Sequence, residues 1–291
     1  MNADTKPAII CLHGHGSSGE IFRTQAQKLT QVLSPHFRFL FLNSPITTPQ
    51  AGVGVQPYYA HMKPYRRWHQ DGNTIGLFDV TAEDVERERR IVRDFLKGVI
   101  DHENGTSGPG PGVVGVMGFS QGTRVATAVC LDSELGKYIK FAIMICGVCP
   151  SLPLSAAEIR VSRPLDIMSV HVQGSGDPWS AKGTRLSKQY FNQTLATVIR
   201  FKGGHEIPVK TGDVQSIARV MVEYWDRDCN DEYNSVSAGV EITVHPSPKW
   251  SSGSSIPDDG LRLASLASLK IWPRAEEHCL PPDLSSTEGY L

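Results

Sequence analysis

The sequence predicts an α/β protein with a doubly wound, mostly parallel β-sheet and helices on both faces, and three observations carry this prediction. Short apolar runs alternate with amphipathic segments over residues 8–226. Several of these runs are apolar on both faces, as strands buried in a parallel sheet are. The apolar run 113–117 leads through a Gly- and Ser-containing turn straight into the apolar segment 125–131, which gives the order strand, tight turn, helix. Alternating strands and helices fold into layered α/β sheets.

The individual elements follow from the same pattern. The expected strands are residues 8–12, 37–42, 113–117, 141–145, 169–172 and 197–201. The expected helices are residues 20–33, 82–102, 121–131, 182–192 and 214–226. Thr81 and Asp84 have the spacing of a capping box, which predicts the start of the second helix. Ligands of such sheets bind beyond the carboxyl ends of the strands, so we expect the chemistry just after each strand.

Two regions depart from the alternating pattern. Residues 44–78 are rich in Pro, Gly and aromatic residues, which predicts a long loop that serves as a pocket wall or lid. Residues 229–291 are rich in Ser and Pro, with a sustained apolar period only at 261–271. We therefore expect residues 1–228 to form the α/β domain and residues 229–291 to form a partly disordered C-terminal extension, with at most one docked helix.

Composition excludes several classes of function. The net charge of −1 gives no global field that would attract nucleic acid or an anionic membrane. No apolar segment approaches the length of a membrane-spanning helix, and residues 1–7 contain no apolar signal core. The expectation is a cytoplasmic protein that binds no nucleic acid and does not insert into membranes.

The six cysteines predict free thiols rather than a disulfide framework. Four of them lie inside apolar runs, as buried free thiols do. Cys146 and Cys149 have the C-x-x-C spacing of redox and zinc sites, but this pair ends an apolar strand and has no second C-x-x-C. A redox or metal role for the pair is kept as the less favoured alternative.

A serine nucleophile with two partners is the strongest chemical prediction. Gly118 to Gly122 has the G-x-S-x-G form of a nucleophile elbow, which lifts the Ser120 hydroxyl out of the sheet edge. Such a serine needs a base and an orienting acid, which in this fold class follow in the chain order Ser, Asp, His. Asp177 follows the strand 169–172 in a Gly-rich turn, and His205 follows the strand 197–201 after Gly203 and Gly204. The spare carboxylates are Glu206, Asp213 and the badly placed Asp166.

An oxyanion hole is expected next to Ser120. Its backbone N–H donors should come from Gln121, directly after the nucleophile, and from His15, in the loop that follows the strand 8–12. His13 is expected to brace this loop by a hydrogen bond. The rival interpretation is a zinc site made by His13, His15 and His205, which no carboxylate or cysteine completes in the sequence.

These residues resemble the fungal serine hydrolase (FSH-type) family of α/β-hydrolases, over residues 6–226. The family is similar to short carboxylesterases and acyl-protein thioesterases, and it includes the lovastatin-type thioesterases that release polyketide chains. The resemblance rests on four short segments: Leu12-His13-Gly14, Gly118-Phe119-Ser120-Gln121-Gly122, Gly176-Asp177 and Gly204-His205. It implies an α/β-hydrolase fold without a large cap domain.

The expected activity is hydrolysis of an acyl ester or thioester through an acyl-enzyme, with no cofactor and no metal. The resemblance favours a polyketide or fatty acyl chain in secondary metabolism, carried by coenzyme A or by the acyl carrier domain of a polyketide synthase. Aromatic residues suggest an apolar acyl pocket, although they would equally serve to pack the loop: Tyr58, Tyr59, Trp68 and Trp179. Three alternatives stay open: a general carboxylesterase on oxygen esters, an acyltransferase, and a non-catalytic ligand-binding protein of the same fold.

Overall fold

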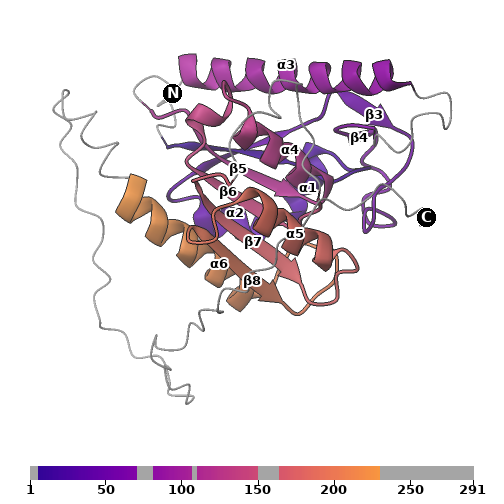
Figure 1. The fold of residues 1–291 in the computed structure, drawn as a ribbon. Coiled ribbons are helices and arrows are strands. Elements are labelled where there is room, and N and C mark those ends of the chain that lie inside the picture. Colours follow the sequence, from indigo (N-terminus) through magenta and orange to yellow (C-terminus); the bar gives the residue numbers. More distant parts are fainter. Residues whose placement is uncertain (1–5, 71–80, 107–109, 150–163, 230–291) are drawn as a thin grey trace, which may run out of the picture. The chain divides into compact units, whose positions relative to one another are not determined.

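The centre of the fold is a six-stranded parallel β-sheet with the strand order β2-β1-β5-β6-β7-β8. Figure 1 labels β5, β6, β7 and β8, which follow one another in this order across the sheet. The computed structural model describes residues 6–70, 81–106, 110–149 and 164–229. The strands of the sheet are β1 (Ala8–Leu12), β2 (Arg38–Leu42), β5 (Val113–Phe119), β6 (Phe141–Ile145), β7 (Met168–Gly174) and β8 (Ala196–Phe201). The α/β class is confirmed, and the described residues contain no large cap domain.

Helices cover both faces of this sheet. The first face is covered by α1 (Gly19–Gln25), α2 (Gln27–Leu33) and α6 (Thr211–Tyr224). The second is covered by α3 (Ala82–Thr106), α4 (Gln121–Leu131) and α5 (Ser180–Tyr190). The described residues also form a 3-10 turn at Gly136–Tyr138 and a π-helical turn at Trp225–Cys229.

The alternation of side chains along the strands explains the two layers. In β1, Ile9 and Cys11 pack in the cluster of the first face, and Ile10 and Leu12 pack in the cluster of the second. All five residues of β1 are buried, because successive side chains of a strand point to opposite faces and both faces are covered.

Most helix positions agree with the sequence pattern, with one break. The segment 20–33 forms two helices, α1 and α2, because Ala26 leaves the helical conformation at φ −88° and ψ 1°. Ser18 begins α1, since its Oγ accepts the Ile21 N–H at 3.2 Å. The capping box at the start of α3 is confirmed: Thr81 Oγ1 accepts the Asp84 N–H at 3.1 Å, and the Asp84 carboxylate accepts the Thr81 N–H at 3.0 Å.

Residues 44–70 contain regular structure that the sequence pattern did not reveal. The expectation of a long loop was wrong here, because β3 (Ile46–Thr48) and β4 (Tyr65–Arg67) pair as a two-stranded antiparallel sheet. Three-residue strands surrounded by Pro and Gly leave no alternating pattern to recognise. Arg67 fixes β4 to α3 through two hydrogen bonds of 2.6 Å to the Glu88 carboxylate. Residues 71–78, the end of that predicted loop, lie outside the described residues.

The C-terminal prediction is not reached by the structure. Apart from Cys229, residues 229–291 lie outside the described residues, so the expected division at residue 228 stays a prediction. Within the described ranges, each helix is too short or too polar to cross a lipid bilayer.

Strand order determines where a site forms. After β1 the chain builds β2 on one side and later returns to place β5 on the other side of β1. This is the position where loops diverge at the carboxyl edge of an open sheet and leave a crevice. Leu12 and Gly118 pair in register, so the loops after β1 and β5 leave the sheet side by side.

Candidate active site

Ser120 occupies a strained turn between β5 and α4. Its φ of 52° and ψ of −119° place a non-glycine residue in a sparsely populated region, at a cost of about 1–3 kcal/mol. The two flanking glycines are required by close backbone contacts. A Cβ on Gly118 would lie 2.6 Å from the Gly122 carbonyl oxygen, and one on Gly122 would lie 2.1 Å from the Leu12 carbonyl oxygen. The elbow therefore packs directly against β1 and holds the Ser120 side chain partly exposed.

His205 connects Ser120 to Asp177. His205 Nε2 lies 2.8 Å from Ser120 Oγ, and His205 Nδ1 lies 2.9 Å from Asp177 Oδ2. Asp177 comes from the turn after β7 and His205 from the turn after β8, so the ends of β5, β7 and β8 supply the group, with β6 between β5 and β7. The tautomer that satisfies both contacts has Nδ1–H donating to the carboxylate and Nε2 accepting the serine hydroxyl. In this state Nε2 is free to take the serine proton.

The Asp177–His205 pair is held away from water. The side chains are 1% and 5% exposed, respectively. Asp177 Oδ1 accepts the Trp179 N–H at 2.8 Å, so its second oxygen is left for His205. The Trp179 ring meets the imidazole edge-on at a centroid distance of 4.5 Å, and Phe119 lies 5.2 Å away. These two aromatic rings restrict the imidazole to the orientation that reaches Ser120.

The loop after β1 is braced from behind. His13 is fully buried, its Nδ1–H donates to the Gly14 carbonyl at 2.8 Å, and its Nε2 accepts the Ser44 N–H at 3.3 Å. Burial is the largest cause that lowers the pKa of His13, to about 4, so its ring is neutral at neutral pH. The Trp68 indole N–H donates to the His13 carbonyl at 2.8 Å. The expectation that His13 braces this loop is confirmed.

This loop reaches Ser120. A Cβ on Gly14 would lie 3.3 Å from the Ser120 Cβ, so the backbone of Gly14 passes directly beside the elbow. His15, the next residue, is exposed. As the first residue of α4, Gln121 has a backbone N–H without a partner inside the helix, and the helix dipole is positive at that end. The two predicted oxyanion donors thus belong to segments that meet at Ser120.

The side chain of Gln121 has a structural role that is separate from the role expected for its backbone N–H. Its Oε1 accepts the Trp68 backbone N–H at 2.8 Å, and its Nε2 donates to the His69 carbonyl at 3.3 Å. The elbow is thereby tied to the segment after β4. No sequence pattern indicates this link, because the partners are far apart along the chain.

Thr123 is a second residue that the sequence reasoning missed. Its Oγ1 donates to the Ser120 carbonyl at 2.6 Å and accepts the Val148 N–H at 3.0 Å. It therefore joins the elbow to the segment after β6. In the sequence, the role of Thr123 is indicated by its position alone, three residues after Ser120 and in the first turn of the expected helix.

The four predicted substrate-binding aromatics do not gather at one place. Trp179 lies against His205. Trp68 is fully buried behind the loop after β1 and presents no open face. Tyr59 packs with Ile21, Val55 and Tyr65, whereas Tyr58 is 78% exposed. The structure therefore brings Trp179 alone of the four into contact with the Ser120–His205–Asp177 group.

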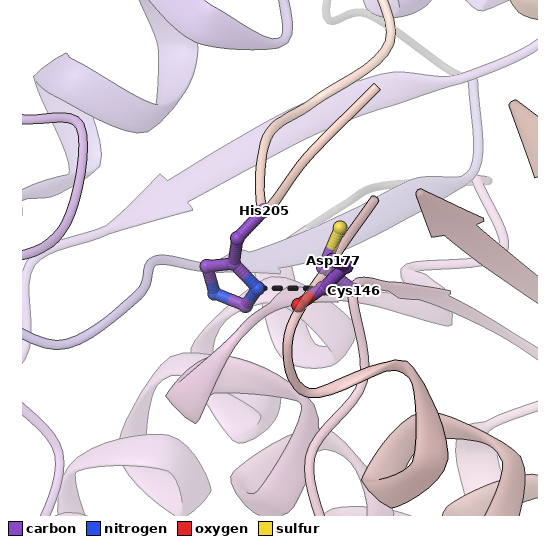
Figure 2. A group of neighbouring side chains, drawn as sticks. All are labelled: Cys146, Asp177 and His205. Atoms are coloured by element: carbon purple, nitrogen blue, oxygen red, sulfur yellow. Dashed lines mark hydrogen bonds and ion pairs between the residues drawn. The ribbon is translucent and has the colours of Figure 1, made fainter. Parts of the chain in front are cut away.

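The cysteines are arranged differently from either C-x-x-C alternative. Cys11, Cys130, Cys146 and Cys149 are free thiols. Cys149 Sγ contacts Gln189 Oε1 at 3.3 Å, whereas Cys146 lies beside Asp177 and His205 (Figure 2). Burial raises the pKa of the Cys146 thiol to about 12, so it is uncharged at neutral pH.

The rival zinc interpretation with His13, His15 and His205 fails on geometry. Both ring nitrogens of His13 are engaged in hydrogen bonds inside the core. Among the residues that the structure describes, the group with mutually close ligand atoms is instead Cys146, Asp177 and His205.

Comparisons with known proteins agree with one another. A family model described as serine hydrolase (FSH1) matches residues 1–217. Thioesterase FSL2 of Gibberella zeae is 44% identical over 233 residues, which cover 76% of this chain and 93% of the relative. The probable esterase azaC of Aspergillus niger is 31% identical over 231 residues, 75% of this chain and 83% of the relative.

A comparison with solved structures supports the fold alone. The carboxylesterase from Mesorhizobium loti superposes with a TM-score of 0.50 at 15% sequence identity, over 76% of this chain and 90% of that one. The six-stranded sheet with helices on both faces and a nucleophile elbow is the α/β-hydrolase fold.

Proposed function

Because the chain belongs to the serine hydrolase (FSH1) family, whose members hydrolyse ester bonds, we propose that Ser120, His205 and Asp177 are its catalytic triad. The observation that carries the proposal is the continuous contact from Ser120 Oγ through His205 to Asp177, at 2.8 and 2.9 Å. The order Ser, Asp, His along the chain is that of α/β-hydrolases.

The reaction follows from this geometry. His205 Nε2 takes the Ser120 proton while Ser120 Oγ attacks the acyl carbonyl carbon. Asp177 keeps the proton on Nδ1 and stabilises the charged imidazole. His205 then gives the proton to the leaving alcohol or thiol, which leaves an acyl-Ser120 ester. Water attacks this ester with His205 again as base, and the acid product and free Ser120 result.

We assign the developing negative charge to the backbone N–H groups of Gln121 and His15. The support for Gln121 is its place at the positive end of α4. The support for His15 is the passage of its loop beside Ser120, at Gly14. In enzymes of this type, loss of one oxyanion donor costs about 10²–10³ in kcat.

We propose an acyl thioester as substrate, with a polyketide or fatty acyl chain carried by coenzyme A or an acyl carrier domain. The support is the 44% identity to a protein named as a thioesterase, together with the family resemblance. A general carboxylesterase is the second candidate, because a 31% identical relative is named as a probable esterase. Acyl transfer uses the same triad, and the added alcohol would then appear in the product.

The first test is labelling by a fluorophosphonate probe. The wild type should be labelled, and Ser120→Ala should not. Equal labelling of both proteins would assign the nucleophile to another residue, and no labelling of the wild type would leave a ligand-binding role.

The second test separates the substrate classes. Octanoyl-coenzyme A and an octanoyl oxygen ester carry the same acyl chain, so the ratio of their kcat/KM values reports the leaving group alone. A ratio in favour of the oxygen ester would select the carboxylesterase.

The division of the chain at residue 228, like a cytoplasmic location, stays a prediction. A protein truncated after residue 229 should keep the thermal stability and kcat of the full chain. Loss of either would assign the extension to the working domain.

A further inference from the structure

Cys146 touches the triad without a part in the proposed chemistry. It directly follows β6 with a φ of 47°, in the left-handed region that a non-glycine residue rarely adopts. Its thiol donates to the Glu206 carbonyl at 3.3 Å and lies 3.8 Å from the Gly204 carbonyl. These carbonyls flank His205 in the chain, so Cys146 lies against the turn that carries the base.

Three different ligand types converge at this point (Figure 2). A thiol sulfur of Cys146, a carboxylate oxygen of Asp177 and a ring nitrogen of His205 all lie within 4.8 Å of one another. The side chains come from the ends of three adjacent strands, β6, β7 and β8. The cluster is therefore set by the sheet rather than by one mobile loop.

The donor set matches one class of metal ion. Zn²⁺ binds Cys sulfur at about 2.3 Å and His nitrogen or Asp oxygen at about 2.0–2.2 Å, in tetrahedral geometry. Ligand atoms of such a site are roughly 3.5 Å apart, so side-chain movements of about 1 Å would bring these three around an ion. Three protein ligands leave a fourth position for water.

We propose that Cys146, Asp177 and His205 form an inhibitory site for Zn²⁺ that excludes catalysis while it is occupied. The claim that Zn²⁺ binds depends on the geometry of the cluster alone. The claim that bound Zn²⁺ inhibits the enzyme rests on the proposed function. The site uses the same imidazole and carboxylate as the triad, so ion and substrate turnover compete for them.

The proton balance explains the inhibition. The His205 nitrogen close to Asp177 is Nδ1, so Zn²⁺ has to bind the lone pair of Nδ1. The Nδ1 proton must then move to Nε2, and the Cys146 thiol loses its proton to solvent. With a proton on Nε2, His205 can no longer accept the proton of Ser120. One proton leaves the protein for each ion bound.

Cys149 provides the matched control. It is the other half of the C-x-x-C spacing, it is half-buried, and its sulfur contacts Gln189 rather than the cluster. If the two cysteines bound the ion together, Cys149→Ser would abolish binding. The proposed site predicts that Cys149→Ser responds to Zn²⁺ as the wild type does.

The first experiment measures inhibition of p-nitrophenyl butyrate hydrolysis by Zn²⁺ in the full-length protein, with each variant compared with its own rate in a chelator. Loss of a residue that only hydrogen-bonds to a metal ligand lowers metal affinity about 10–100-fold. Cys146 is proposed as a direct ligand, so Cys146→Ser should raise the inhibition constant for Zn²⁺ at least about tenfold. An unchanged inhibition constant in Cys146→Ser, or its rise in Cys149→Ser, overturns the proposal.

The second experiment needs no enzyme activity. Co²⁺ added to the Ser120→Ala protein should produce a thiolate-to-cobalt charge-transfer band and the intense visible bands of a tetrahedral ion, and Zn²⁺ should remove them. The same protein with Cys146→Ala should lack the charge-transfer band. A band that survives Cys146→Ala, or no band in the protein that keeps Cys146, overturns the site.

The two experiments keep the proposals apart. A wild type that is active but insensitive to Zn²⁺ refutes the inhibitory site and leaves the triad intact. A wild type that is inactive but gives the cobalt band refutes the triad function and leaves the metal site intact.

Discussion

The two sides of Ser120, the proposed nucleophile, are held in place in different ways. On the side of the proposed oxyanion donors, here called the oxyanion side, the loop after β1 is fixed by hydrogen bonds from residues distant in the chain, including the Trp68 indole and the Ser44 backbone. On the acid–base side, Asp177 and His205 lie in turns of adjacent strands and are bracketed by Trp179 and Phe119. The acid–base side thus depends on local turn geometry, and the oxyanion side depends on long-range bracing.

The largest expected effect comes from Asp177→Asn. The amide nitrogen can donate to His205 Nδ1, which selects the tautomer with a proton on Nε2 and leaves no base for Ser120. We expect kcat for p-nitrophenyl butyrate to fall by about 10³–10⁴ while the thermal unfolding temperature changes little.

Asp213→Asn is the control, because Asp213 is a half-buried carboxylate in the first turn of α6. If Asp177→Asn kept full activity and Asp213→Asn were inactive, Asp213 rather than Asp177 would be the orienting acid. The contrast between the two sides of Ser120 would then no longer hold.

The second prediction concerns acid stability and uses two buried neutral histidines, His13 on the oxyanion side and His171 in β7. Burial is the largest cause that lowers the pKa of His13, and burial also lowers the pKa of His171, each to about 4. Arg66 and His15 also lower the pKa of His13, whereas Glu20 and a hydrogen bond to Gly14 raise it, each to a smaller extent.

The sign follows from proton binding. Between pH 6.5 and pH 4 the unfolded chain binds these protons and the folded chain does not, so the free energy of unfolding falls as the pH falls. Each histidine contributes a slope of about 1.4 kcal/mol per pH unit in this window. Denaturant titrations at several pH values measure it.

His171→Leu should remove one of the two slopes. His171 packs edge-on against Phe191 and makes a 3.1 Å contact with Ser169 Oγ, so the variant also changes stability at pH 7. The pH dependence is the decisive quantity. A variant slope equal to that of the wild type would contradict the assignment of His171.

The third prediction concerns the bracing of the oxyanion side. Trp68→Phe keeps an aromatic ring and removes the indole N–H, which leaves the buried His13 carbonyl without its donor. We expect a loss of about 1–3 kcal/mol in the free energy of unfolding and a lower kcat.

Tyr65→Phe is the matched change on the same stretch of chain. Its hydroxyl makes long contacts of 3.4 and 3.5 Å with backbone carbonyls, so its loss should cost less than that of the indole N–H. Equal losses in both variants would show that the bracing is general packing.

The smallest effect is expected at the aromatic residues around the site. Trp179→Leu should lower kcat by up to about tenfold through a less restricted His205, and it should leave KM nearly unchanged.

Tyr58→Ala removes a ring that is 78% exposed, so it should leave kcat unchanged and raise KM for long acyl chains if this ring contacts the substrate. Steady-state kinetics with butyryl and octanoyl esters separate the two outcomes.

The acid–base side could be predicted from the sequence better than the oxyanion side. Ser120, Asp177 and His205 each follow an apolar strand, so residue type, order and strand position indicated where they would meet. Trp68 looked like a pocket residue, because nothing in the sequence tells a buried indole that donates to His13 from one that lines a cleft. The bracing contacts of Gln121 and Ser44 depend on the β3–β4 hairpin, whose three-residue strands carry no readable pattern.

The position of β8 has a consequence for how activity appears and disappears. β8 is the outermost strand on its side of the sheet, and His205 lies in the turn that follows it. During synthesis Ser120 and its elbow leave the ribosome well before His205, so the nascent chain carries an unactivated serine until this edge is added. Edge elements also open locally at a lower free energy than the core. If Ser120, His205 and Asp177 act as proposed, detachment of β8 would switch off hydrolysis while the rest of the sheet remained folded, and inactivation should precede global unfolding on heating.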